Sequence, residues 1–194
     1  VMQIDPVLRR VVTDKRELSY DRLISTIPFP QLLQLCGVAY DASLYSWNKV
    51  LVFNLGFDSK GADTRNNWVY FPSKELSFYR IGYYDNIFGS DRMSLYVELG
   101  FDKDAPIDVE YWFGRVLADL RASGIITTQQ LISHHSVVMD PAYVHINEQC
   151  TADVQTKKAL LAQSGIYSIG RYGSWTYCSI EDGMVEAKEI SISY

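Results

Sequence analysis

The sequence predicts an α+β fold in which an antiparallel or mixed β-sheet is flanked by helices. Four strand-like stretches follow one another between residues 49 and 101. Strands joined by short polar turns usually pair antiparallel. The best helical pattern comes directly afterwards, at 107–123. We therefore expect a sheet of about five or six strands with this helix packed on one face.

The segment before the sheet predicts a hairpin, a strand and a short helix. Residues 7–12 and 16–20 are expected to pair around a three-residue turn. Residues 22–27 are apolar and β-branched and stop at a proline, which is typical of a buried strand. Two prolines then mark the start of a helix that ends at Gly37.

The strand candidates of the sheet share apolar or aromatic residues at alternating positions and polar turn residues between them. They are Lys49–Phe57, Asn67–Phe71, Ser77–Tyr84 and Ser94–Phe101. In the last of these, apolar side chains occupy every second position from Leu95 to Phe101. That period of two predicts a sheet with one apolar face.

Helical patterns dominate the second half of the chain. The 107–123 stretch carries an apolar stripe at helical spacing and stops at Gly124. A weaker helical pattern spans 152–163, followed by a short strand at 166–169. A final helix is expected from about 180 to 190. The 166–169 strand needs a pairing partner, and residues 22–27 or a second copy of the chain could supply it.

Composition limits the classes of protein that are compatible with the chain. It has 194 residues, 47% hydrophobic and 21% charged, within the globular range. The net charge of −5 and the lack of a Lys/Arg block argue against a nucleic-acid partner. No apolar run reaches the roughly 18 residues of a membrane span. Three dispersed cysteines without CxxC predict a reducing, cytoplasmic location, and a first residue that is not methionine leads us to expect residues upstream.

The C-terminal strand–loop–helix pattern is the best candidate ligand site. A strand is expected to end at Gly170, a loop to pass through Gly173, and a helix to start after Ser179, which forms a capping box with Asp182. Glycines allow close approach of a ligand, and a helix start attracts electron-rich oxygen. With the cation of Arg171, the pattern suits the edge of a flavin or a phosphate. Such loops also occur without any ligand.

Three motifs resemble a known family. The run GRYGSWTYCSIEDGM from Gly170 resembles the C-terminal flavin-contacting motif of UDP-galactopyranose mutases, members of the amine-oxidase-like FAD superfamily. Residues 67–72, NWVYFP, with Phe78-Tyr79-Arg80, resemble the Trp-x-Tyr-Phe-Pro and Phe-Tyr-Arg segments of the same family. Residues 20–28, YDRLISTIP, match a pattern common across the superfamily. The matches run from near residue 5 to the end of the chain.

The resemblance implies an organisation and an activity. The dinucleotide fingerprint G-x-G-x-x-G is absent from these residues. Residues 1–30 and 141–194 would belong to an FAD-binding α/β domain, and 31–140 would form the substrate domain. The whole protein would interconvert UDP-galactopyranose and UDP-galactofuranose for cell-surface polysaccharides, including lipopolysaccharide. Reduced FAD would be its cofactor, and the present fragment alone would be inactive and without FAD.

The resemblance also implies substrate contacts. Arg80 would pair with the diphosphate of the UDP-sugar, since a guanidinium matches phosphate oxygens. Tyr143 and Tyr177 would donate hydroxyls to phosphate oxygens, and Trp68 and Tyr70 would line the pocket. Without the motif, a surface arginine on an exposed strand face is the favoured interpretation of Arg80, and strand aromatics are more often core residues.

Cofactor contacts would come from the C-terminal motif. Arg171 would lie near the flavin and the sugar and would act with Arg80 in catalysis. Gly170 would let the flavin approach the backbone, and Asp182 would contact its ribityl chain. Gly183 and Met184 would place backbone N–H groups near the flavin ring. The alternative for Asp182 is a helix cap, and the two roles are compatible.

Two departures and two rival functions stay open. Thr176 stands where many relatives have lysine, and residues 142–147 do not repeat the usual family segment. These differences affect the identity of the sugar. The rivals are an FAD-dependent amine-oxidase-like oxidoreductase and a stand-alone, non-enzymatic binding domain. A homo-oligomer is compatible with the sequence, and a zinc site is not predicted because the histidines and cysteines match no zinc-ligand spacing.

Overall fold

The computed structural model describes residues 1–192, which fold into two compact units. The first unit contains Val1–Trp47 and the described residues from Tyr143 to Ile192, and the second contains Asn48–Ala142. The chain leaves the first unit within strand β5 (Ser46–Phe57) and returns within β9 (Leu131–His145). By packing, the first unit therefore extends to Trp47. The domain limits predicted at residues 30 and 140 stay a prediction. The roles of the two units as cofactor and substrate domains stay a prediction.

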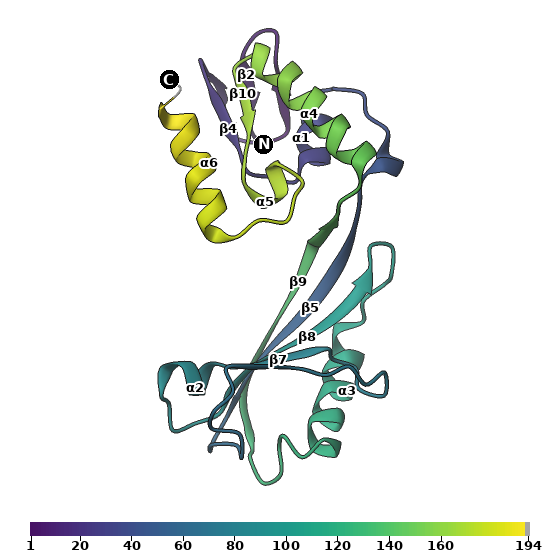
Figure 1. Cartoon of the computed structure of the whole chain (residues 1–194), viewed down its shortest axis with the longest axis vertical. Helices are drawn as coiled ribbons and strands as arrows, with labels where there is room; N and C mark the ends of the chain where they lie inside the picture. The colour runs from purple at the N-terminus through teal and green to yellow at the C-terminus, as the bar shows by residue number, and fades with distance from the viewer. Residues whose placement is uncertain (193–194) are drawn as a thin grey trace. The chain divides into compact units, whose positions relative to one another are not determined.

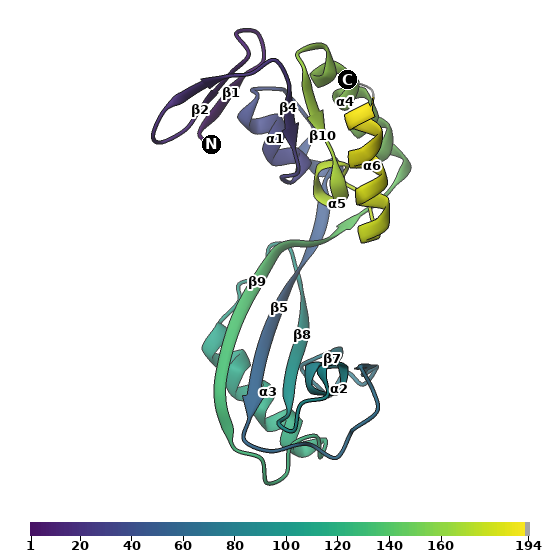
Figure 2. The ribbon, with the colours of Figure 1, turned by 90° about the vertical axis from the view of Figure 1, so that its left-hand side faces the viewer.

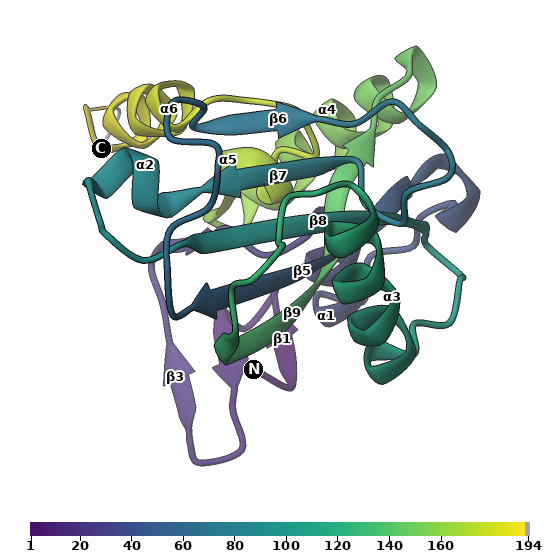
Figure 3. The same cartoon turned by 90° about the horizontal axis from the view of Figure 1, so that it is seen from below.

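The second unit is built on a five-stranded sheet of order β6-β7-β8-β5-β9 (Figure 3). Its other strands are β6 (Trp68–Tyr70), β7 (Arg80–Tyr83) and β8 (Ser94–Asp102). The pairs β6–β7, β7–β8 and β5–β8 are antiparallel. This confirms the predicted fold class and strand number. β9 was not expected from the sequence. The strand predicted to end at Tyr84 ends at Tyr83, because helix α2 (Tyr84–Phe88) begins at the next residue.

One face of this sheet packs on helix α3 (Val109–Ala122), as Figures 1 and 3 show. The Asp108 side chain caps the helix by accepting from the Tyr111 N–H at 3.0 Å. Val116 and Leu120 are fully buried in a cluster with residues of β5, β7 and β8. The alternating apolar residues Leu95, Val97 and Leu99 of β8 belong to that cluster, so the period-two pattern does mark the core face.

The first unit begins with a three-stranded antiparallel sheet, part of which Figure 2 shows. Its strands are β1 (Gln3–Asp5), β2 (Arg10–Val12) and β3 (Glu17–Ser19). β2 and β3 form the predicted hairpin, closed by the Thr13 N–H, which donates to the Arg16 carbonyl at 2.9 Å. β1 adds a strand that the sequence did not indicate.

A parallel pair of strands forms the second sheet of this unit. β4 (Leu23–Ser25) pairs with β10 (Ile166–Ser168), which confirms the pairing expected for the C-terminal strand. A Cβ on Gly165 would lie 2.5 Å from the Asp21 carbonyl oxygen. A Cβ on Gly173 would lie 3.0 Å from the Ser25 carbonyl oxygen. Both glycines therefore allow backbone segments to pack at close range.

Helices complete the first unit: α1 (Phe29–Leu35), α4 (Glu148–Gln163), α5 (Gly170–Gly173) and α6 (Ile180–Ile192), with a short 3-10 turn, η1 (Ala42–Leu44). α4 starts earlier than predicted because the Asn147 side chain accepts from the Cys150 N–H at 2.8 Å. The expected loop at 170–173 is a short helical turn. Phe29, Leu32 and Leu33 of α1 are fully buried, and the edge-on contacts of Trp175 with Tyr45 and Trp47 extend the same core.

Candidate functional site

Arg80 is held on the face of the second unit's sheet that points away from the core. The register places it between Tyr70 on β6 and Glu98 on β8. Its Nη2 donates to Glu98 Oε1 at 2.5 Å, and its Nη1 donates to the Tyr70 hydroxyl at 3.0 Å. The Tyr79 hydroxyl donates to Glu98 Oε2 at 2.5 Å. Glu98 is only 5% exposed, so a buried carboxylate fixes the direction of the guanidinium.

Aromatic rings surround the same guanidinium. Its central carbon lies 5.6 Å, 5.9 Å and 6.0 Å from the ring centres of Tyr70, Tyr79 and Tyr96. Tyr96 lies across Gly82, where a Cβ would come within 1.8 Å of the ring. Trp68 and Tyr70 are 56% and 58% exposed, so these two strand aromatics are not core residues. The Arg80 side chain is 22% exposed, so its charge is largely shielded from solvent and its position is fixed by its neighbours.

Arg171 forms the second cationic centre, in the first unit. Its central carbon lies 4.8 Å from the Tyr143 ring centre and 4.7 Å from the Tyr177 ring centre. The two rings are 6.4 Å apart and inclined by 21°, and the guanidinium contacts both. Within residues 1–192, the buried Nε of Arg171 has no hydrogen-bond partner. Three residues predicted to contact ligand are thus brought together from β9, α5 and the segment after α5.

Glu186 of α6 fixes the helical turn that carries Arg171. One carboxylate oxygen accepts from the Gly170 N–H at 2.6 Å, and the other accepts from the Ser174 hydroxyl at 2.7 Å. Lys158 of α4 pairs with the same carboxylate at 3.3 Å. Burial alone would raise the pKa of Glu186, but the bonds from Gly170, Ser174 and Lys158 outweigh it and lower the pKa. The sequence did not single out Glu186, because its partners lie 12 to 28 residues away.

The start of α6 confirms the predicted capping box. Asp182 Oδ2 accepts from the Ser179 N–H and the Ser179 hydroxyl, both at 2.8 Å, and the Asp182 N–H donates to Ser179 Oγ at 3.1 Å. The bonds from Ser179 lower the pKa of Asp182. The Gly183 N–H donates to the Ser179 carbonyl at 3.3 Å, and Met184 is 67% exposed. Flavin contacts by Asp182, Gly183 and Met184 stay predictions.

The residues around α5 and α6 fit the edge of a flavin. Apart from the chain neighbours and the backbone of the same helix, no described atom lies within 4 Å of the Cβ position of Gly170 or Gly183, so a flat ring has room beside both backbones. Arg171 offers a permanent cation, and its buried Nε can donate to an acceptor. These two properties, open backbone and an available donor, are what an electron-rich ring edge requires.

The histidines have separate structural contacts. His134 stacks on Phe113 with ring centres 4.3 Å apart, and His145 Nδ1 shares a hydrogen bond of 3.0 Å with the Ser46 hydroxyl. Across residues 1–192, no cluster of three or more His, Cys, Asp or Glu side chains could hold a metal ion. No helix in this part of the chain has the length and apolar character that crossing a membrane requires.

Comparison with known proteins places the fold. No family model matches the chain, and no curated protein matches it. The crystal structure of a reduced UDP-galactopyranose mutase superposes with a TM-score of 0.80 and 23% identity, covering 91% of this chain and 41% of that one. A candidate protoporphyrinogen oxidase from Exiguobacterium gives a TM-score of 0.69 and 17% identity, covering 94% and 44%. A CLA-producing fatty acid isomerase from P. acnes superposes with a TM-score of 0.67 and 13% identity, covering 100% of this chain and 46% of that one.

These likenesses define the class of fold. The chain has an α+β architecture that corresponds to part of the FAD-dependent oxidoreductase fold. It spans less than half the length of each of these three solved structures. Among them, the mutase has the highest TM-score and identity.

Proposed function

We propose that this chain is part of a flavin-dependent nucleotide-sugar mutase that interconverts UDP-galactopyranose and UDP-galactofuranose for cell-surface polysaccharide synthesis. The observation that carries the proposal is the arrangement of Arg171 between Tyr143 and Tyr177. A cation flanked by two phenols suits an oxygen-rich anion. The mutase likeness, with its TM-score of 0.80, supports the same assignment.

The two units would divide the work. In the first, Arg171 and Gly170 would lie at the flavin edge, with Asp182, Gly183 and Met184 contacting the cofactor from α6. Reduced FAD, when bound, would supply the nucleophile for the anomeric carbon. In the second unit, which carries Trp68 and Tyr70, the chain would bind the UDP moiety.

Arg80 would neutralise the diphosphate as it leaves and returns. Its guanidinium is already oriented by Glu98, so little reorganisation is required when a phosphate binds. Tyr143 and Tyr177 would donate their hydroxyls to phosphate oxygens.

A second candidate is an FAD-dependent amine-oxidase-like oxidoreductase. The TM-score of 0.69 with the candidate protoporphyrinogen oxidase favours it. That function requires an apolar or aromatic-cage site, and it gives Arg80 no anion to bind. Phosphate affinity therefore discriminates between the two candidates.

The test is a titration of the chain with UDP, monitored by calorimetry or NMR. Arg80→Ala and Arg171→Ala should each weaken UDP binding about tenfold or more, since each removes a charge-assisted contact. Arg16→Ala, an exposed arginine on the N-terminal hairpin, is the matched control and should leave the affinity unchanged. Equal affinity of all three variants and the parent chain would refute the proposal.

A turnover experiment separates the mutase from the oxidoreductase. The dithionite-reduced flavoprotein that contains this chain should convert UDP-galactofuranose to the pyranose. No conversion, together with amine-dependent reduction of the oxidised flavin, would favour the second candidate.

A further inference from the structure

A cavity lies in the second unit, on the core side of the sheet and apart from the residues of the proposed function. It measures about 290 Å³, near the lower limit for pockets that hold small molecules. Its walls are mostly apolar. They include Val69, Phe71, Met93 and Ile125, with Asp63 and Asn66 among its polar residues. Trp68, Tyr70 and Arg80 contribute nothing to it, since strand alternation directs them to the opposite face.

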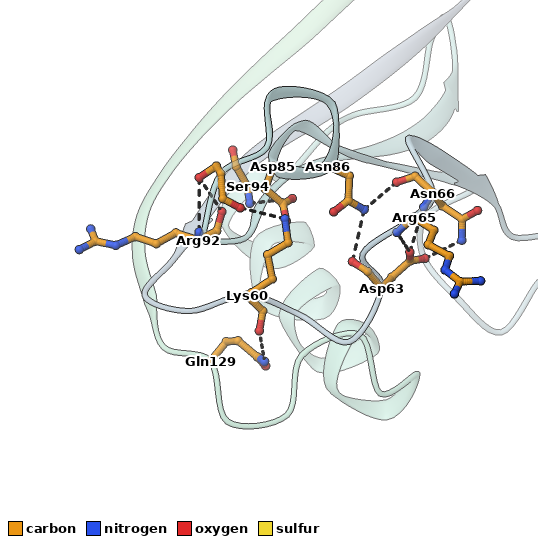
Figure 4. Close-up of polar contacts among 10 residues, drawn as sticks. Lys60, Asp63, Arg65, Asn66, Asp85, Asn86, Arg92, Ser94 and Gln129 are labelled. Atoms are coloured by element: carbon orange, nitrogen blue, oxygen red, sulfur yellow. Dashed lines mark hydrogen bonds and ion pairs between the residues drawn. The ribbon is translucent and has the colours of Figure 1, made fainter.

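A polar network fixes the loop beside this cavity, as Figure 4 shows. The Asp85 carboxylate, whose side chain is 0% exposed, pairs with Lys60 at 2.8 Å and accepts from the Ser94 N–H at 3.2 Å. The Asn86 amide donates to the carbonyl oxygens of Asp63 at 3.3 Å and Asn66 at 2.8 Å. A buried charge is retained only when it is paired and hydrogen-bonded, so this network holds the 60–66 loop in one position.

The same loop is tied down at two further points. The Gln129 side-chain amide donates to the Lys60 carbonyl at 3.0 Å. Asp63 Oδ1 accepts from the N–H groups of Arg65 and Asn66, both at 3.0 Å. A loop fixed in this way preserves the cavity without needing a ligand to order it, which lowers the entropic cost of binding.

Tyr83 is the one tyrosine among the residues that line the cavity. Its side chain is among the cavity's lining residues and is only 4% exposed. Within the part of the chain that the structure describes, its hydroxyl bonds to no protein group, and it does not belong to the fully buried polar atoms that lack a partner. Burial, with help from the carboxylates of Asp63 and Asp85, raises the pKa of Tyr83 to about 12. The hydroxyl therefore stays protonated at neutral pH, and the Asp63 carboxylate among the lining residues disfavours an anionic ligand.

We propose that this cavity binds an uncharged, ring-sized organic molecule whose hydrogen-bond acceptor pairs with the Tyr83 hydroxyl. The apolar walls would bury the body of the molecule, and a carbonyl or ether oxygen would satisfy the donor that the protein leaves unpaired. The site is independent of the nucleotide-sugar proposal and stands or falls separately from it.

The test uses the full chain and cyclohexanone as the probe. Titration should give saturable shifts of the Gly61 and Gly124 amide signals in ¹H–¹⁵N NMR spectra, because both residues line the cavity. Tyr83→Phe keeps the ring and removes the donor, so it should weaken binding about fivefold. Tyr84→Phe, at the neighbouring tyrosine outside the cavity, is the matched control and should bind like the parent chain.

Two further measurements complete the test. Ala62→Leu adds bulk at an exposed residue of the cavity wall and should abolish the shifts without unfolding the chain. Cyclohexanecarboxylate, which matches the probe in size but carries a charge, should bind at least tenfold more weakly. The proposal is overturned by a lack of saturable shifts, by equal affinity of Tyr83→Phe and parent, by undiminished binding to Ala62→Leu, or by equally tight binding of the carboxylate.

Discussion

Replacing Glu186 by alanine should loosen the turn that carries Arg171. The change removes the acceptor of two hydrogen bonds, from Gly170 and Ser174, and one ion pair with Lys158. A bond to a charged group contributes about 1.5–3 kcal/mol, and bonds that share one acceptor group are not additive. The ion pair, whose side chains are 32% and 29% exposed, adds at most about 0.5 kcal/mol. We expect a loss of about 3 kcal/mol in unfolding free energy, and about half of that for Glu186→Gln.

Urea unfolding followed by circular dichroism measures this loss, and hydrogen exchange at the Gly170 amide localises it. Protection of that amide should fall in Glu186→Ala, because its acceptor is gone. Glu181→Gln, an exposed carboxylate in the first turn of α6, is the control and should cost less than about 0.5 kcal/mol. If the two variants lose equal stability and Gly170 exchange does not change, the reasoning is wrong.

The same carboxylate predicts a dependence of stability on pH. Its pKa in the folded chain lies below its ordinary value of 4.5, so the folded state favours the ionised form. The contribution of Glu186 is therefore fully present above about pH 4.5 and is lost as the pH falls through the lower, folded-state pKa. Glu186→Gln should flatten this part of the stability curve, and an unchanged slope between pH 5 and about pH 3 would contradict the assignment.

Two further predictions concern the Arg80 cluster. Gly82→Ala should lower the unfolding free energy by about 1–3 kcal/mol, because the added Cβ would meet the Tyr96 ring at 1.8 Å; thermal melts should show the loss, and Tyr96→Ser should restore most of it. Glu98→Gln should weaken UDP binding about fivefold by releasing Arg80 from its fixed orientation. In a double-mutant cycle with Arg80→Ala the two effects should not add, whereas additive effects would show that Glu98 acts through the fold alone.

Local patterns predicted much of the fold. The β2–β3 hairpin, the sheet of the second unit and α3 follow from alternation, turn residues and capping signals that lie close together in the chain. β9 was missed because residues 131–145 are mostly exposed and include Ser133, His134 and His135. Its extended form depends on pairing with β5, more than 70 residues earlier in the chain, and no short window of sequence records such a partner.

In the candidate sites, too, local signals were predictable from the sequence and contacts between distant residues were not. The capping box of α6 is a local signal, and it was predicted correctly. The contact between Arg171 and Tyr143 joins residues far apart in the chain, and only the family resemblance indicated both. Glu98 and Glu186 were not anticipated at all, since each acts on residues of other strands or helices. The roles of such carboxylates become visible only once the packing around them is known.

The glycines of the C-terminal motif carry two different kinds of information. A Cβ at Gly173 would crowd the Ser25 carbonyl oxygen of β4 and the Ser168 hydroxyl, both at 3.0 Å, so the close packing favours glycine there. Gly170, in contrast, has empty space around its Cβ position and a positive φ of 76°, so its own conformation and that open space account for it. The spacing of the two glycines is therefore evidence of how the strand and turn pack together. Only the open space beside Gly170 bears on which ligand the motif could bind.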